Sequence, residues 1–226
     1  MDAAEAAKIV AAQQSLEFVK DGMVVGLGSG STATHFIKLL GEKVKAGLKI
    51  RGISSSQASE NLAKSLSIPI IDFRQASEID VAIDGADEIG PHLALLKGGG
   101  GALLREKIVA SAAKRFIVVA DSSKIVRRLG KFPLPVEVIP MAAPLVEKKI
   151  LALGIPSKVR QAKTGGDYIT DEGNLILDCA CGEIADPKAL AASLRAMVGV
   201  VEHGLFLDMA EMALVADAGE VKTIYK

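Results

Sequence analysis

Residues 23–44 read MVVGLGSGSTATHFIKLLGEKV, and this stretch decides the fold class. The apolar run 23–27 predicts a short buried strand, and the glycine-rich segment 28–32 then turns the chain. Apolar side chains return at helical spacing before Gly47, at Phe36, Leu39, Leu40 and Val44. A strand, a glycine turn and a helix in this order indicate a parallel β-α unit.

The same alternation of strand and helix patterns extends outward from this unit. An apolar repeat over 3–20 predicts a helix, which ends at the helix stop Asp21-Gly22. Alternating strands and helices favour an α/β domain in which helices cover both faces of a mostly parallel sheet. The further expected elements are strands at 50–53, 70–73, 81–83 and 116–120, an apolar run at 93–96, and helices ending at Leu66 and spanning 102–113.

A change in composition at Lys131 indicates a second domain. The four prolines between Pro133 and Pro144 exclude a long helix or a central strand and suit a crossing between domains. We expect one domain over 1–130 plus about 205–226, and a smaller α+β domain over about 131–204. The smaller domain should contain helices at 143–153 and 187–197 and strands at 168–170 and 175–178, while strands at 213–216 and 221–225 suit either sheet.

The composition excludes several classes of function. A chain of 226 residues that is 50% hydrophobic and 24% charged can bury a full core. Its 27 Lys and Arg residues balance 27 Asp and Glu residues, so it lacks the cationic excess typical of binding to nucleic acids or anionic lipids. Six Phe, two Tyr and no Trp leave few rings for stacking on single strands. We therefore expect neither a nucleic acid nor a membrane as a partner.

The N-terminus and the cysteines indicate the compartment. Met1-Asp2-Ala3-Ala4-Glu5 is acidic where a signal or transit peptide is basic, and no apolar run approaches the ~18–20 residues that span a bilayer. Cys179 and Cys181 cannot build a disulfide framework, and an isolated C-x-C pair is a weak zinc signal. We expect a cytoplasmic protein.

Polar clusters follow most of the apolar runs. In an open parallel sheet, the loops that leave the carboxyl ends of the strands lie along one edge, and ligands bind there. We therefore expect most of these clusters to converge on one crevice. They are residues 29–32, 54–57, 84–88, 97–101 and 121–124.

The segment Gly28-Ser29-Gly30-Ser31-Thr32-Ala33 matches the permissive G-x-G-x-x-A form of the dinucleotide fingerprint. A nicotinamide site also needs an acidic residue about 20 positions further on to bind the ribose hydroxyl, and residues 52–56 contain none. Hydroxyls and backbone amides without a carboxylate better suit a single phosphomonoester. The alternative is a tight strand-to-helix turn with Ser or Thr as its cap.

Asp84-Gly85-Ala86-Asp87-Glu88 places three carboxylates within five residues. Crowded carboxylates can hold a divalent cation or serve as acid and base, and the alternative is a solvated Asp-Gly turn. The histidines at 35, 92 and 203 are scattered without ligand spacing. A catalytic metal site is therefore not expected.

Lys97 is followed by four glycines, Gly98-Gly99-Gly100-Gly101. Consecutive glycines cost conformational entropy on folding and are typical of backbone that wraps closely around a ligand. Together with the cationic Lys97, their amides suit an oxyanion. Glu106 follows on the next predicted helix, between Arg105 and Lys107, where the alternative is a solvated helix face.

Five groups of residues in this chain occur in the order typical of one enzyme family. They are GSGST at 28–32, SSS at 54–56, DGADEI at 84–89, KGGG at 97–100 with REK at 105–107, and KFPLPVE at 131–137. In this combination the chain resembles the ribose-5-phosphate isomerase family of type A, essentially from end to end. The family often has Gly-Thr-Gly-Ser-Thr where this chain has Ser29, a change from one hydroxyl to another that keeps phosphate binding possible.

The resemblance implies an aldose-ketose isomerase that interconverts ribose 5-phosphate and ribulose 5-phosphate in the pentose phosphate pathway, without a metal ion or organic cofactor. It also implies a Rossmann-like domain with a mostly parallel sheet, a smaller α+β domain, and a homodimer or homotetramer. By similarity, Glu106 is the general base, and Asp84, Asp87 and Lys97 are further catalytic residues. The implied substrate-binding residues are Ser29, Gly30, Ser31, Thr32, Asp84, Gly85, Ala86, Asp87, Lys97, Gly98, Gly99, Gly100 and Lys124.

Isomerisation of this kind needs few groups. A base removes a proton from the carbon beside the carbonyl, an enediolate forms, and the proton returns to the neighbouring carbon. Glu106 can carry that proton while Lys97 and the glycine amides stabilise the negative charge, and either Asp84 or Asp87 can assist ring opening. Two other classes are less well supported: a non-catalytic sugar-phosphate sensor would not need Glu106, which this chain retains, and a nucleotide-dependent oxidoreductase would need an acidic residue near Ser54, which is absent.

Overall fold

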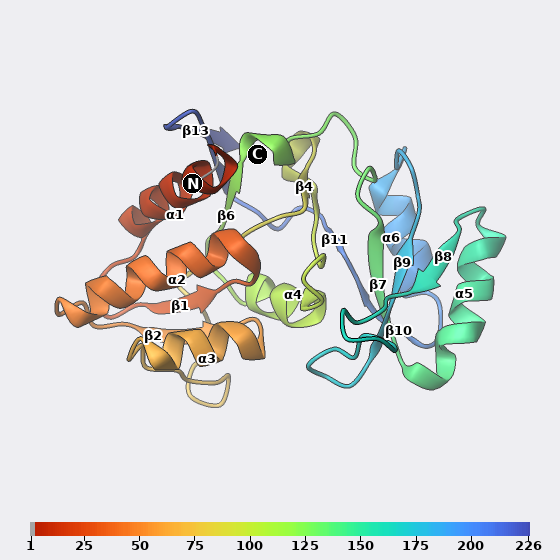
Figure 1. The fold of residues 1–226 in the computed structure, drawn as a ribbon, viewed down its shortest axis with the longest axis horizontal. Coiled ribbons are helices and arrows are strands. Elements are labelled where there is room, and N and C mark those ends of the chain that lie inside the picture. Colours follow the sequence, from red (N-terminus) through yellow and green to blue (C-terminus); the bar gives the residue numbers. More distant parts are fainter. Residues whose placement is uncertain (1–2) are drawn as a thin grey trace. The chain divides into compact units, whose positions relative to one another are not determined.

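The computed structural model describes residues 3–226, so Met1 and Asp2 of the acidic N-terminal stretch lie outside the described residues. Its contacts divide the chain into two compact units, each with its own core (Figure 1). The first unit contains the described residues up to Ala86, together with Arg105–Ile125 and Asp208–Lys226. The second contains Asp87–Leu104 and Val126–Leu207.

The first unit is built on a six-stranded sheet with the strand order β13-β12-β6-β3-β1-β2. Neighbouring strands pair in parallel except β13, which pairs antiparallel with β12. The two terminal strands, whose sheet the sequence left open, therefore belong here, and the predicted α/β class is confirmed. The strands are β1 Val24–Leu27, β2 Arg51–Ser54, β3 Val81–Asp84, β6 Phe116–Asp121, β12 Met212–Asp217 and β13 Glu220–Tyr225.

Helices pack on this sheet and bury its apolar strands. Helix α2 contributes Phe36, Ile37 and Leu40, which are all completely buried in the core, and burial of each such side chain stabilises the fold by about 1.5–3 kcal/mol. Helix α3 begins where Ser56 accepts a hydrogen bond from the amide of Ser59. No helix among residues 3–226 is long and apolar enough to cross a membrane. The helices are α1 Ala3–Ser15, α2 Gly30–Lys45, α3 Gln57–Ser65 and α4 Leu103–Ser111, and α1 continues into the 3-10 turn Leu16–Phe18.

The strand expected at 70–73 does not form. Ile70 makes only an isolated bridge to Gly52. The chain then turns at Asp72, whose side chain accepts a hydrogen bond from the amide of Arg74 and whose carbonyl accepts one from the amide of Gln75. The apolar run was a misleading signal because this local turn removes the following residues from the sheet.

The second unit contains two smaller antiparallel sheets, with the strand orders β10-β7-β9-β8 and β11-β5-β4. Helix α5 packs against β8 and β9, and α6 packs against β10. The apolar residues of β7 and β9 form its core with those of the two helices. The elements are β4 Glu88–Ile89, β5 Leu95–Leu96, β7 Leu134–Val138, α5 Ala143–Ala152, β8 Ser157–Val159, β9 Leu175–Cys179, α6 Pro187–Arg195, β10 Val200–His203 and β11 Leu205–Phe206.

Two predictions for this segment were wrong. The proline-rich stretch contains β7, a central strand that pairs with both β9 and β10. Pro135 is accommodated near the start of β7, where its carbonyl accepts a hydrogen bond from the amide of Gly204. No strand forms at 168–170, and β9 pairs instead with β8.

The boundary between the units differs from the expected one at 87–104. Strand β5 pairs with β4 and with β11, so this segment lies in the second unit rather than the first. A two-residue strand leaves no recognisable periodicity, and its partner β11 lies more than a hundred residues away. The division into a domain of 1–130 with 205–226 and a domain of 131–204 stays a prediction.

Candidate active site

The carboxyl edge of the first unit's sheet collects several of the predicted site residues. Strands β1, β3 and β6 are neighbours in this sheet. The segments that leave their carboxyl ends contain Ser29–Thr32 after β1, Asp84–Ala86 at the end of β3, and Lys124 in a 3-10 turn after β6. The structure therefore brings these residues to one edge of the sheet, as the sequence predicts.

The glycine loop opens α2 with its backbone amides at the helix N-terminus. Gly30 is the first residue of α2 and has a φ of 86°, a conformation that residues with a Cβ rarely adopt. Ser29 precedes it, but its side chain makes no capping hydrogen bond, so the turn is not the hydroxyl-capped alternative. The Ser29 hydroxyl instead bonds to that of Ser55 at 2.8 Å. Helix amides and hydroxyls in this arrangement suit a phosphate.

Asp84 and Ser59 bind backbone groups of the glycine loop. Asp84 is 4% exposed, and its Oδ1 accepts hydrogen bonds from the amides of Ser29 at 2.9 Å and Gly85 at 2.7 Å. The Ser59 hydroxyl donates to the carbonyl of Gly28 at 2.6 Å. Ser59 was missed because a serine inside a polar helix carries no signal of a contact with a loop 31 residues away.

Glu106 lies in the first turns of α4 and is 6% exposed. A short link joins the end of α4 to the amino end of β6, where the amide of Lys114 bonds to the carbonyl of Ile79. The C-terminal end of α4 thus lies at the amino edge of the sheet. The first turns of α4, which contain Glu106, are therefore directed toward the carboxyl edge. Lys107 is 7% exposed, so the solvated-face alternative for this triplet is wrong.

Lys97 and the four glycines belong to the second unit. They follow β5 of the three-stranded antiparallel sheet, so this cluster is not among those that leave the edge of the parallel sheet. The Lys97 side chain is buried, and its ammonium group lies 5.5 Å from the centroid of the Phe206 ring. A buried ammonium group acts on nearby negative charge through a low dielectric, which strengthens the attraction.

The three carboxylates of 84–88 bind separate backbone segments. Asp87 Oδ2 accepts a hydrogen bond from the amide of Gly99 at 2.7 Å, and a Cβ at Gly99 would lie 2.5 Å from the other oxygen, so any larger residue would displace the Asp87 carboxylate. Glu88 accepts from the amides of Gly130 and Phe132. Among residues 3–226, no three His, Cys, Asp or Glu side chains gather in a way that could hold a metal ion.

A family model described as ribose 5-phosphate isomerase A (phosphoriboisomerase A) matches residues 51–220. The chain belongs to the ribose 5-phosphate isomerase A family. The ribose-5-phosphate isomerase A of Sphingopyxis alaskensis is 49% identical over 221 residues, which cover 98% of this chain and 96% of the relative. That of Shouchella clausii is 52% identical over 220 residues, which cover 97% and 96%.

Solved structures of ribose 5-phosphate isomerases have the same fold. A D-ribose-5-phosphate isomerase in complex with phospho-erythronic acid is 41% identical, covers 100% of both chains and superposes with a TM-score of 0.96. The ribose 5-phosphate isomerase A of Methanocaldococcus jannaschii is 40% identical, with a TM-score of 0.94 and coverage of 98% of this chain and 99% of that one. The family, the fold and the enzyme class predicted from the sequence are confirmed.

Glu137 ends the last of the motifs that this chain shares with the isomerase family. It is 1% exposed, and its Oε1 accepts hydrogen bonds from the Thr170 hydroxyl at 2.9 Å and from the side-chain Nδ2 of Asn174 at 3.0 Å. The backbone amide of Leu104, at the start of α4, also donates to this carboxylate. Burial raises the pKa of Glu137, and the donors offset part of that rise.

The two cysteines do not join the predicted site. Both are free thiols, Cys179 as the last residue of β9 and Cys181 two residues beyond it. Burial raises the pKa of Cys181 to about 11 and raises the pKa of Cys179 further. Thiols with such raised pKa values carry almost no thiolate near neutral pH and are poor nucleophiles.

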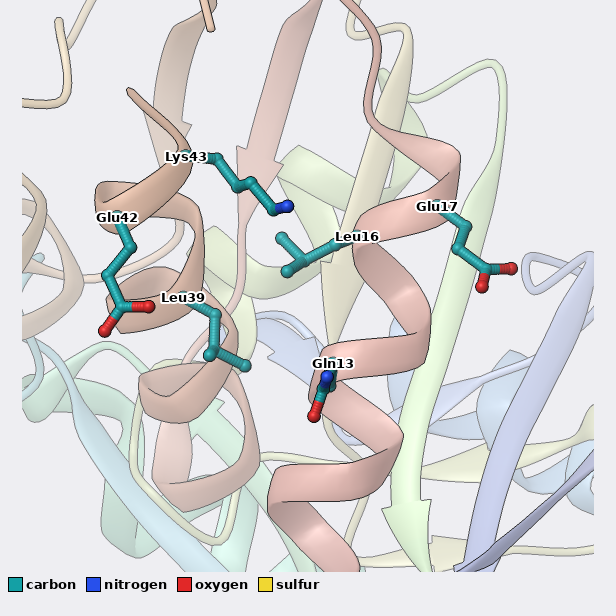
Figure 2. Close-up of a pocket in the computed structure, with 6 residues that line it drawn as sticks. All are labelled: Gln13, Leu16, Glu17, Leu39, Glu42 and Lys43. Atoms are coloured by element: carbon teal, nitrogen blue, oxygen red, sulfur yellow. The ribbon is translucent and has the colours of Figure 1, made fainter. Parts of the chain in front are cut away.

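A surface pocket of about 430 Å³ lies between the first two helices of the isomerase fold, away from the glycine loop. Figure 2 shows Leu39 and Lys43 of α2 together with Leu16 and Gln13 from the first helical segment. Lys43 is 13 residues beyond Gly30, and the helical rise of 1.5 Å per residue places it roughly 20 Å along α2. This pocket is therefore not part of the predicted phosphate site.

Proposed function

We propose that this chain interconverts ribose 5-phosphate and ribulose 5-phosphate through an enediolate, with Glu106 as the general base. Family membership supports the reaction, and the burial of Glu106 in the first turns of α4 is the observation that supports its role. Glutamate side chains are seldom as little exposed as the 6% of Glu106, and a buried carboxylate between charged neighbours is typical of a catalytic group in a water-poor site.

The proton transfer needs one carboxylate. Glu106 takes the proton from C2 of the open-chain aldose, the C1 carbonyl oxygen gains negative charge in the enediolate, and the proton returns to C1 to give the ketose. Because one base serves both transfers, no further acid is required for them. Either Asp84 or Asp87 moves protons among the sugar oxygens and assists opening of the furanose ring.

Separate groups bind the two ends of the substrate in this proposal. The phosphate binds at the loop Ser29–Thr32, where α2 amides and hydroxyls are presented, with Lys124 as a cationic neighbour and Gly85 and Ala86 beside it. Lys97 and the segment Gly98–Gly100, in which the Gly99 amide is already bonded to Asp87, stabilise the charge that develops on the sugar oxygens. The phospho-erythronic acid bound to a relative also carries both a phosphate and an oxygen-rich acid end, which fits such a division.

The experiment compares Glu106→Gln with wild type in an assay of ketose formation from ribose 5-phosphate. The amide keeps the size of the side chain and removes the proton acceptor, so kcat should fall by about 10²–10⁴-fold while KM changes little. Glu42→Gln, at an exposed position of α2, is the matched control and should keep full activity. Retention of more than about a tenth of wild-type kcat by Glu106→Gln would contradict the assignment.

The relatives carry enzyme names, which favours catalysis over the non-catalytic sensor. We propose that the reaction needs neither a metal ion nor an organic cofactor, since a lysine and amides can stabilise the enediolate. A homodimer or homotetramer and a cytoplasmic location stay predictions from the family resemblance.

A further inference from the structure

The four-glycine segment after Lys97, Gly98–Gly101, is bound by a side chain from a distant part of the second unit. Arg160 directly follows β8, and its Nη1 donates hydrogen bonds to the carbonyls of Gly98 at 2.9 Å and Gly99 at 3.1 Å. Its side chain is 13% exposed. The guanidinium group therefore lies against two consecutive peptide groups of the loop.

Asp178 fixes the direction of this guanidinium group. The Nε and Nη2 atoms of Arg160 donate to the two carboxylate oxygens of Asp178, at 3.0 Å and 2.5 Å. Asp178 lies on β9, which pairs with β8, so both ends of the ion pair are attached to one sheet. A bidentate pair of this kind leaves Nη1 pointing in one direction, which the flexible ammonium of a lysine cannot reproduce.

These contacts determine which way the loop amides point. In a trans peptide the carbonyl and the N–H point in opposite directions. The bond from Arg160 to the Gly98 carbonyl therefore turns the Gly99 amide to the opposite side, where Asp87 accepts it at 2.7 Å. By the same geometry, the bond to the Gly99 carbonyl turns the Gly100 amide away from Arg160.

A run of four glycines has no side chains of its own to select one conformation, so its order must come from neighbours. We propose that Arg160, oriented by Asp178, is a positioning residue that holds the Gly98–Gly100 segment in one conformation, in which the Gly99 amide binds Asp87 and the Gly100 amide, on the side away from Arg160, stabilises the enediolate. Its positive charge also polarises the two peptide groups and strengthens their N–H donors. This inference rests on the proposed function and adds to it a residue that does not touch the substrate.

The consequence is a defect in turnover rather than in binding. Displacement of catalytic groups by about 1 Å can cost on the order of 10²-fold in rate, so Arg160→Ala should lower kcat by about 10–100-fold. KM should change little, because the phosphate is held by the loop before α2. Arg160→Lys should show a similar loss, and Asp178→Asn, which keeps an oxygen for Arg160 but removes the charge, a smaller one.

The test measures kcat, KM and melting temperature for these variants, wild type and Arg128→Ala. Arg128 is the matched control because it pairs with Glu183 on the exposed surface of the same unit, and its variant should keep wild-type kcat. Guanidinium at millimolar concentration should restore part of the kcat of Arg160→Ala and leave Arg128→Ala unchanged. A role in folding alone would not produce this rescue.

Wild-type kcat in Arg160→Ala, or a loss of kcat that guanidinium does not restore in the folded variant, would overturn the proposal. If Arg160→Ala does not fold, Arg160→Lys decides, and wild-type kcat there overturns it equally. Wild type and Glu106→Gln, measured in the same assay, distinguish a failure of the proposed function from a failure of the proposed role of Arg160. An inactive wild type overturns the proposed function as well, whereas an active wild type with an unimpaired Arg160→Ala overturns only the role of Arg160.

Discussion

Replacement of Asp84 tests how the sheet edge of the first unit holds the glycine loop. Asp84 Oδ1 accepts hydrogen bonds from the amides of Ser29 and Gly85, and the residue is 4% exposed. Asp84→Ala removes the acceptor of both bonds. Asp84→Asn keeps an oxygen in a side chain of nearly the same shape and removes only the charge, so the two variants separate the loss of the bonds from the loss of the carboxylate.

The expected magnitude follows from these two bonds. A hydrogen bond to a charged group contributes about 1.5–3 kcal/mol, so the two together have an upper limit of about 6 kcal/mol. Ser29 and Gly85 are only half-buried, and water can replace part of each bond. We therefore expect the free energy of unfolding to fall by about 2–4 kcal/mol in Asp84→Ala and by about 1 kcal/mol in Asp84→Asn. At ~2–4 °C per kcal/mol for a chain of this length, the melting temperature should fall by roughly 4–16 °C and 2–4 °C.

Thermal unfolding and steady-state kinetics with ribose 5-phosphate together form the assay. Asp84→Ala should raise KM because the loop that we propose binds the phosphate loses its support, and Asp84→Asn should keep KM close to that of wild type. A low kcat in Asp84→Asn would assign ring opening to Asp84, and an unchanged kcat would assign it to Asp87. The reasoning is refuted if Asp84→Ala melts and binds like wild type, or if the Asn variant is as unstable as the Ala variant.

The remaining predictions concern pH and metal ions. Burial raises the pKa of Glu137 in the folded state above its ordinary value of 4.5. The protonated carboxyl group therefore stabilises the folded state below pH 4.5, and this contribution is lost as the pH rises through the folded-state pKa. Glu137→Gln does not titrate, and its free energy of unfolding, measured in urea, should decline less over that window than that of wild type; parallel pH curves would contradict this. Turnover of ribose 5-phosphate should persist in EDTA, and activity that EDTA abolishes and magnesium or manganese restores would contradict a metal-free reaction.

Local patterns predicted the parts of the fold that depend on neighbouring residues. The strand, glycine turn and helix over 23–45 are observed nearly as predicted, because burial of an apolar run and helical spacing are local properties. Short or irregular elements were less predictable. Residues 70–73 have an apolar pattern but turn at Asp72, and the central strand β7 contains Pro135 as its second residue, near the strand's start.

The same distinction applies to the candidate site. The residue types of the glycine loop, the Asp84 segment, Lys97 and Glu106 were recognisable because each follows a strand or opens a helix, and their combination identified the family. The sequence could not distinguish a solvated Glu106 from a buried one, since exposure depends on what packs against the helix.

The sequence by itself determined the α/β class and the family, and it supplied the residues proposed to carry the chemistry, because these depend on local periodicity and on short motifs. Only the tertiary structure decided that Asp84 binds the loop before α2 and that Arg160, paired with Asp178, binds the glycine run after Lys97. The Asp84–Ser29 and Arg160–Gly98 contacts join residues 55 and 62 positions apart, and a hydrogen bond across such a separation depends on strand pairing that brings the two segments together. No residue spacing along the chain indicates these hydrogen bonds, so they can be recognised only once the sheets have formed.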